Sequence, residues 1–256
     1  MINKVKELQV IDETVNLELQ KRIDENDKRR KEAEYMPKGA VKEDYFDFLE
    51  SVGVSCEKPR KVPTPLPKDD YPRIKGITND DFESFVAFDF ETTGINSNQD
   101  AIIEVGAIKV IDGKIIESKE YIFQEFVKPY KKKISEKIKE ITGIDNADVE
   151  NARDMWEVIP DFMEFVGDLP LVGFNSNAFD CRFLERAGRY SHIIIKNDSF
   201  DVMTYANSFK KELNIKKQRC SLADLSVALS ITNPQAHRAL ADAITTAKVF
   251  IELKRR

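Results

Sequence analysis

The chain has 256 residues, 41% hydrophobic and 9% aromatic, which suits one ordinary domain with an appendage or two small domains. Its net charge of −5 does not favour nucleic-acid binding, although bound metal would offset the carboxylates of a site. No apolar run approaches the ~20 residues that span a bilayer. The three cysteines form no closely spaced metal or redox motif. We therefore expect a soluble, cytoplasmic protein with reduced cysteines and no membrane partner.

Residues 1–80 differ in composition from the rest. Apolar residues recur at spacings of three and four from Val5 to Ile23, which predicts an amphipathic helix. The charged run that follows, 21–34, is more typical of a solvated helix face than of a nucleic-acid patch. Five prolines between Pro59 and Pro72 indicate an extended linker. We therefore divide the chain into a charged, mainly helical extension with a Pro-rich linker, residues 1–80, and a second domain, residues 81–256. The extension is either a helical module that contacts nucleic acid, a polymerase or another copy, or a flexible tether.

The second domain opens with a buried strand that carries two acids. Five of the six residues from Phe85 to Phe90 are apolar. Asp89 and Glu91 flank Phe90, and residues i and i+2 of a strand share a face, so both carboxylates project together. Two such charges at a buried strand end are costly unless a cation neutralises them. Taken alone, the pattern is more often a solvated strand end, so a metal site needs further partners.

The next segments predict a three-stranded antiparallel meander. Residues 101–111 are rich in β-branched residues, Asp112-Gly113 is a hairpin signal, and 114–127 continues as a strand. Glu104, inside the second strand, is expected at the sheet edge or beside the ligands rather than among them. The lysine-rich segment 128–139 is equally typical of a solvated loop and helix or of phosphate contacts.

Strands and helices alternate in the remainder of the chain. Helices are predicted over 153–166, from Asp180 onward, and over 201–209, 221–229 and 237–253, with strands at 170–174 and 193–195. Asn175 either caps the helix that Asp180 begins or hydrogen-bonds the site. This order predicts an α/β fold with a mixed sheet and helices on its faces. Asp242 reaches the first two acids if the last helix packs beside the first strand.

These segments supply four carboxylates and one histidine: Asp89, Glu91, Asp180, Asp242 and His237. The set suits two-metal hydrolysis of a phosphodiester, in which two divalent ions activate a water and stabilise the leaving oxygen. Oxygen ligands favour Mg²⁺ or Mn²⁺ over Zn²⁺. Histidine is the side chain that most readily exchanges a proton near neutral pH, so it suits removal of a proton from that water.

The sequences F-D-F-E-T-T-G, N-S-N-A-F-D and H-R-A-L-A-D resemble, in order and spacing, the three motifs of the DEDD exonuclease superfamily. The histidine subtype (DEDDh) fits, because the alternative subtype needs tyrosine where Arg238 stands. The nearest resemblance is to DnaQ-like exonucleases, the proofreading (epsilon) type of bacterial DNA polymerase III, and it spans about Phe82 to Leu253. It implies a ribonuclease H-like sheet of three antiparallel strands followed by parallel strands, and 3′→5′ release of nucleoside monophosphates from single-stranded or frayed DNA ends.

The resemblance also implies a role for each site residue. Asp89 would bridge both metal ions, Glu91 and Asp242 would hold the water-activating ion, and Asp180 the second ion. His237 would be the general base.

Further residues are implied to contact the substrate. Thr92 and Thr93 would meet the terminal nucleotide, Phe90 and Phe179 would form walls of its pocket, and Asn175 would assist. One departure is Phe174, where many relatives have histidine. Two alternatives remain open: an RNA-trimming exoribonuclease on the same fold, and a catalytically silent module that binds strand ends or a polymerase.

Overall fold

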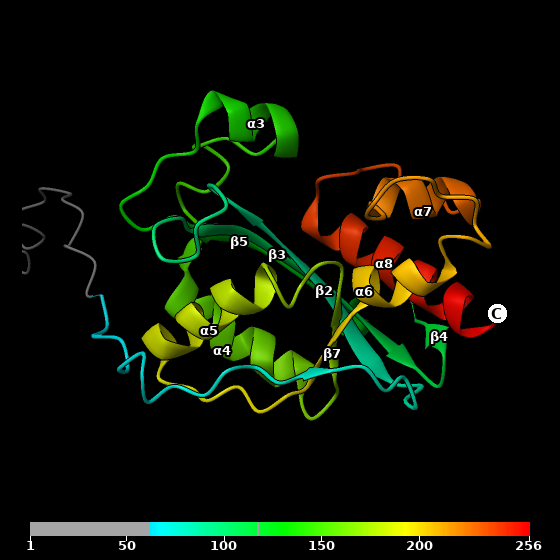
Figure 1. Cartoon of the computed structure of the whole chain (residues 1–256). Coiled ribbons are helices and arrows are strands. Elements are labelled where there is room, and N and C mark those ends of the chain that lie inside the picture. The colour runs from blue at the N-terminus through cyan, green and yellow to red at the C-terminus, as the bar shows by residue number, and fades with distance from the viewer. Residues whose placement is uncertain (1–61, 117) are drawn as a thin grey trace, which may run out of the picture. The chain divides into compact units, whose positions relative to one another are not determined.

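The computed structural model of the chain describes residues 62–116 and 118–256, and these belong to one unit from Val62 to Arg256 (Figure 1). The expectations for residues 1–61, including the amphipathic helix, lie outside the described residues. The strands are β1 Gly76–Ile77, β2 Phe85–Thr92, β3 Ile102–Ile111, β4 Lys114–Ile115, β5 Ile122–Lys128, β6 Arg153–Asp154, β7 Leu171–Gly173 and β8 Ser199–Asp201. The helices are α3 Glu136–Thr142, α4 Met155–Val166, α5 Asp180–Ser191, α6 Val202–Ala206, α7 Leu222–Ala228 and α8 Ala239–Lys254, with 3₁₀ turns η1 Lys119–Tyr121 and η2 Asn207–Phe209.

The strands form one mixed sheet in the order β1-β8-β7-β2-β3-β5-β6, with β4 paired to β3. The predicted meander is confirmed, since β2, β3 and β5 pair antiparallel, whereas β7, β8 and β1 continue the sheet in parallel with β2. Asp112 and Gly113 turn the chain with φ of 49° and 70°, as a tight hairpin with primed geometry requires. The single strand predicted over 114–127 is instead divided into β4 and β5 by η1.

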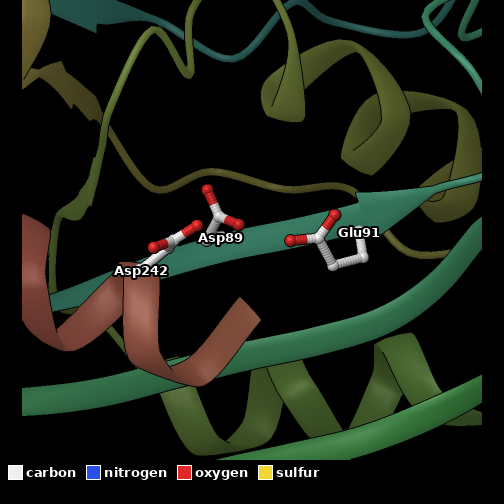
Figure 2. A group of neighbouring side chains, drawn as sticks. All are labelled: Asp89, Glu91 and Asp242. Carbon is white, nitrogen blue, oxygen red and sulfur yellow. The ribbon is translucent and has the colours of Figure 1, made fainter. Parts of the chain in front are cut away.

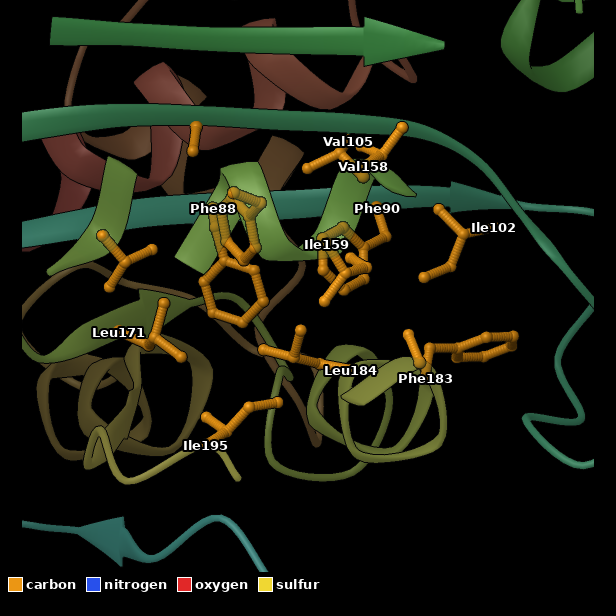
Figure 3. Close-up of a cluster of buried hydrophobic side chains, with 14 of the residues drawn as sticks. Phe88, Phe90, Ile102, Val105, Val158, Ile159, Leu171, Phe183, Leu184 and Ile195 are labelled. Carbon is orange, nitrogen blue, oxygen red and sulfur yellow. The ribbon is translucent and has the colours of Figure 1, made fainter. Parts of the chain in front are cut away.

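Alternate residues of β2 belong to different cores. Phe88 and Phe90 pack with residues of α4 and α5, including Ile159 and Leu184 (Figure 3). Phe85 and Ala87 instead join a cluster with residues of α6, α7 and α8. The sheet is thus covered by helices on both faces, and the odd-numbered positions of β2 face α8. Asp89 and Glu91 occupy those positions.

Two expectations differ from the structure. No strand forms over 193–195; β8 begins at Ser199, and Leu171 of β7 pairs with it. The boundary predicted at residues 80 and 81 lies inside the unit, because β1 pairs in parallel with β8. Tyr71, from the supposed linker, is 8% exposed and donates a hydrogen bond to the Ile193 carbonyl at 2.9 Å. Residues 62–80 are therefore part of this folded unit. None of the helices in the described ranges has the length and apolar composition to cross a membrane.

Candidate active site

Three carboxylates converge on the α8 side of β2. Asp89, Glu91 and Asp242 each have one carboxylate oxygen in this group, and the three oxygens lie within 4.8 Å of one another. Figure 2 shows Asp89 and Glu91 side by side along β2, with Asp242 reaching them from the first turn of α8. The expectation that the last helix packs beside the strand of Asp89 and Glu91 is confirmed, since α8 lies against β2.

Small residues let α8 lie this close to the sheet. Ala239 and Ala243 are fully buried on the inner face of α8. A Cβ added to Gly106 of β3 would lie 2.1 Å from the Leu240 backbone nitrogen, so no larger residue fits there without moving the helix. Gly106 pairs with Asp89 across β2 and β3. The close approach thus occurs at the level of the acids.

Asp180 lies at the edge of β2 that faces β7. Strand β7 pairs with β2 only at Val86 and Ala87, so the edge of β2 is open farther along. There the Phe90 backbone N–H donates to Asp180 Oδ1 at 3.1 Å. Asp180 is 2% exposed and begins α5. The fourth acid therefore lies beside β2, near Asp89 but outside the group of three.

Burial and neighbouring negative charges raise the pKa values of these acids. Burial, followed by the charges of Asp180 and Glu91, raises the pKa of Asp89 well above its ordinary range. Burial and the charge of Asp242 raise the pKa of Glu91 to about 8, and burial raises that of Asp180 to about 7. Such a site favours a cation, and its all-oxygen donor set fits Mg²⁺ or Mn²⁺.

Both oxygens of Asp242 are held by the segment that precedes α8. The backbone N–H of His237 donates to Oδ2 at 3.0 Å, and the Asn233 side chain donates to Oδ1 at 2.5 Å. His237 itself is exposed, with a positive φ of 65°. Sequence reasoning placed His237 beside Asp242 but missed Asn233, which no recognisable motif marks.

A buried ion pair fixes the start of α8. Glu104 is 0% exposed and accepts hydrogen bonds from Arg238 Nη2 at 2.8 Å and Nε at 3.1 Å. It also accepts from the Ala239 backbone N–H at 3.1 Å and from Gln124. Glu104 lies opposite Glu91 in the β2–β3 pairing. As expected, it lies beside the acidic group; its role there is to anchor the helix that carries Asp242.

We expect Glu104→Gln to lower kcat for the expected release of nucleotides about 10- to 100-fold. A neutral amide holds Arg238 less firmly, so the start of α8 shifts and moves Asp242 and His237 with it. Mg²⁺ titrations of the rate give the apparent metal affinity, which we expect to fall by a similar factor. Gln124→Ala, which removes one neutral partner of Glu104, is the control and is expected to cost less than fivefold. Equal kcat and equal metal affinity in Glu104→Gln and the wild type would contradict this anchoring role.

The residues predicted to contact substrate lie in different surroundings. The Thr93 N–H donates to the Ala101 carbonyl at 2.8 Å, and the Thr92 hydroxyl donates to the Gly94 carbonyl at 2.7 Å. These groups stabilise the turn, so the Thr93 N–H is already paired within the fold. Phe90 is 3% exposed in the core, on the opposite face of β2 from the acids, and only its N–H reaches the site.

The segment before α5, residues 174–179, is held by contacts with Asp201 and with the core. Phe179 is the N-cap and packs on Phe183 with ring centroids 5.1 Å apart, so Asn175 does not cap this helix. Asn175 has a φ of 59°, and its N–H donates to Asp201 Oδ1 at 3.2 Å. Asp201 is thus a support for the motif that the sequence did not reveal. Phe174 packs against the core on the α8 side.

Known proteins share both the sequence pattern and the fold. The model of the Exonuclease family matches residues 86–250. DNA polymerase III PolC-type of Clostridium perfringens is 38% identical over 168 residues, which cover 66% of this chain and 11% of that protein. The corresponding protein of Thermotoga maritima is 35% identical over 190 residues, or 73% of this chain and 13% of that protein. The chain therefore spans only about a tenth of the length of these relatives.

Solved structures agree on the fold. E. coli Exonuclease I in complex with a dT13 oligonucleotide matches with a TM-score of 0.59 at 17% identity, covering 68% of this chain and 42% of that one. Cell-death related nuclease 4 matches with a TM-score of 0.54 at 16% identity, covering 68% and 64%. The sheet order, the helices on both faces and the extent of the family match agree with one another. The chain belongs to the exonuclease family and has the ribonuclease H-like fold of its DnaQ-like members.

Proposed function

We propose that this protein is a metal-dependent 3′→5′ exonuclease that releases nucleoside monophosphates from single-stranded or frayed DNA ends. The observation that carries the proposal is the convergence of Asp89, Glu91 and Asp242 from two distant segments, with Asp180 beside them. The raised pKa values of Glu91 and Asp180 support a cation at this position. The name of the PolC-type relatives and the oligonucleotide bound to Exonuclease I support DNA as the substrate.

Two Mg²⁺ or Mn²⁺ ions fit the donor set, and when bound they would activate a water and stabilise the leaving 3′ oxygen. Asp89, Glu91 and Asp242 would hold one ion, with Asp89 shared and Asp180 completing the second position. The exposed His237 adjoins Asp242 through its backbone, so its imidazole is free to accept a proton from the attacking water.

The partners follow from this activity. We propose that the protein binds 3′ ends of single strands in the cytoplasm, in replication proofreading or repair. Association with a polymerase, or with another copy through the N-terminal extension (residues 1–80), is part of the same proposal; the PolC-type relatives support the polymerase association only.

The activity is tested with a 5′-labelled single-stranded DNA and its RNA counterpart, each incubated with Mg²⁺, Mn²⁺ or EDTA. We expect a ladder that shortens from the 3′ end of DNA and that EDTA abolishes. A ladder on RNA alone would reassign the substrate to RNA. Absence of cleavage of either strand would contradict the proposal and would favour a module that only binds strand ends.

A further inference from the structure

A cationic pocket lies on the outer side of α5, beyond the carboxylate site. Its walls include Lys68, Arg182, Arg186 and Arg189, together with Arg73 and Glu185. Arg73 and Glu185 neutralise each other in an ion pair of 2.6 Å. We call the four remaining cations the cationic surface.

The charges of the cationic surface are not balanced by acids within the described ranges. Arg186 Nη1 donates to the carbonyls of Ser97 and Asp100 at 2.8 and 2.7 Å, and Arg189 Nε donates to the Leu66 carbonyl at 2.7 Å. Carbonyls orient a guanidinium but leave its full charge in place. Lys68 and Arg182 are exposed and have no ion-pair partner among the residues that the structure describes.

Nearby acids do not cancel this charge. The Asp100 carboxylate accepts the Asn96 N–H at 2.9 Å and pairs with Lys132 at 3.3 Å. Asp69 and Asp70 follow Lys68 in sequence but do not line the pocket. Four cations therefore gather locally in a chain whose net charge is −5. Clustered cations of this kind raise the local concentration of anionic ligands.

The cationic surface lies along α5, the helix that Asp180 begins. Arg182 lies two residues after Asp180 on α5, and Ser97 lies on the loop that follows β2. Because a helix rises 1.5 Å per residue, Arg189 lies about 14 Å along α5 from Asp180. Phosphates of one duplex strand lie about 3.4 Å apart along the axis and those of an extended single strand lie farther apart, so this length spans more than one phosphate.

Aromatic rings adjoin the cations. Tyr130 and Trp156 meet edge to face with centroids 5.8 Å apart, and Trp156 lies 6.5 Å from Tyr190. The Arg186 guanidinium lies 5.8 Å from the Tyr190 ring centroid. All three rings are half-buried and so retain some accessible surface. A cationic groove flanked by aromatic rings is the pattern by which single strands are bound without sequence preference.

The pocket itself is small. Its volume is about 70 Å³, and charged side chains make up most of its walls. Its charge therefore suits a phosphate group.

We propose that the cationic surface binds the sugar-phosphate backbone of a single strand upstream of the nucleotide held at the carboxylates. The proposal rests on the proposed function for the choice of nucleic acid, but its binding step needs no cleavage. It also assigns a function to this face of α5 that is separate from the chemistry at Asp89.

The test compares the wild type with Lys68→Gln/Arg182→Gln in the full chain. Binding of a fluorescent single-stranded DNA of about 20 nucleotides is measured by anisotropy in EDTA, across a range of salt concentrations. Each phosphate contact contributes about 0.7 to the slope of log affinity against log salt, so we expect the slope to fall in magnitude by about 1.4. Over a fourfold salt range, two contacts correspond to about a sevenfold difference in affinity. In Mg²⁺ we expect a matching rise in KM for this strand and unchanged kcat on a dinucleotide, which cannot reach the surface.

The control variant is Lys114→Gln/Lys119→Gln, which makes the same change in net charge. Both lysines are exposed, and they lie beyond the end of β3 that is opposite to Glu104. The proposal is overturned if Lys68→Gln/Arg182→Gln has the wild-type slope, or if the control lowers the slope equally. Equal competition by an oligoglutamate of the same charge would overturn it in favour of an acidic protein partner. Lack of cleavage by the wild type, with the expected slopes, would contradict the proposed function and leave this binding surface in place.

Discussion

Replacing Asp89 with asparagine is expected to lower kcat for release of nucleotides by about a thousandfold or more. Asp89 lies among Asp180, Glu91 and Asp242, so its charge contributes to any cation held between them. Metal ions contribute several kcal/mol to stabilising charge in such transition states, and each 1.36 kcal/mol is a factor of ten in rate. The measurement is kcat on a labelled single-stranded oligonucleotide at saturating Mg²⁺.

The control for this prediction is Asp168→Asn. Asp168 is exposed and follows α4, remote in sequence from the motifs, so the same chemical change there is expected to leave kcat unchanged. Near-normal Mg²⁺-dependent activity in Asp89→Asn would contradict both the assignment of the site and the proposed function.

Asp89→Asn is also expected to stabilise the metal-free protein against unfolding. Glu91 has a pKa of about 8 in the folded state against an ordinary value of 4.5, so the folded protein retains a proton that the unfolded chain releases. The contribution of Glu91 to stability in EDTA is therefore fully present below about pH 4.5 and is lost as the pH rises through about 8. Burial and the charges of Asp180 and Glu91 also raise the pKa of Asp89, so Asp89 adds to the same decline and its removal makes the decline shallower. Thermal unfolding in EDTA at about pH 6 and pH 8 measures the effect, and wild-type melting temperatures that rise over this interval would contradict it.

The part of the site that follows from local periodicity could be read from the sequence. Asp89 and Glu91 share a face because a strand repeats every two residues, whatever surrounds it. Asp180 at the start of α5 and Asp242 in the first turn of α8 follow from equally local helix signals. The mixed sheet and its antiparallel meander follow from the hairpin at Asp112 and from the alternation of elements.

The supports of the site could not be read in the same way, because they join positions far apart in the chain. Glu104 and Arg238 are separated by 134 residues, and neither has a motif that names its partner. Gly106 lacks a side chain because α8 lies against it, a fact that only the packed structure reveals. The Thr93 N–H pairs with the Ala101 carbonyl, a contact that the motif itself does not indicate.

Tertiary contacts also explain the two errors of fold. Ile193 and Ile195 have the β-branched composition of a strand, but the Ile193 carbonyl is taken by the Tyr71 hydroxyl, and Ile195 fills the core. The strand forms at Ser199 instead, where Leu171 lies opposite. Tyr71 lies within the proline-rich stretch, whose composition alone predicts a linker. Propensity was overridden in both places by a partner from a distant segment.

His237→Asn is expected to lower kcat by about 10²- to 10⁴-fold, the usual contribution of a positioned acid–base group. The His237 backbone has a φ of 65°, a conformation that asparagine tolerates better than alanine. Asparagine also keeps the N–H that donates to Asp242 Oδ2. The substitution therefore removes the imidazole while the carboxylate stays in place. Rates at saturating Mg²⁺ give kcat, and Mg²⁺ titrations are expected to give an unchanged apparent affinity.

The second histidine supplies a matched control. His192 also has a positive φ, 57°, and is exposed at the end of α5, where its Nε2 lies 2.6 Å from the Thr64 carbonyl oxygen. His192→Asn therefore makes the same change of side chain in the same backbone conformation, twelve residues after Asp180 at the far end of α5. We expect it to retain wild-type kcat, with a small loss of stability from the missing hydrogen bond.

Chemical rescue separates a catalytic imidazole from a merely structural one. Because His237 is exposed, imidazole added in solution can reach the space that His237→Gly leaves, and glycine accepts the positive φ without strain. We expect added imidazole to restore part of kcat in His237→Gly and to leave Asp89→Asn inactive, since a proton acceptor cannot replace a lost carboxylate charge. A slow His237→Gly that imidazole does not accelerate, together with wild-type kcat in His237→Asn, would exclude His237 as the proton acceptor. The backbone N–H that holds Asp242 would then be the contribution of this residue.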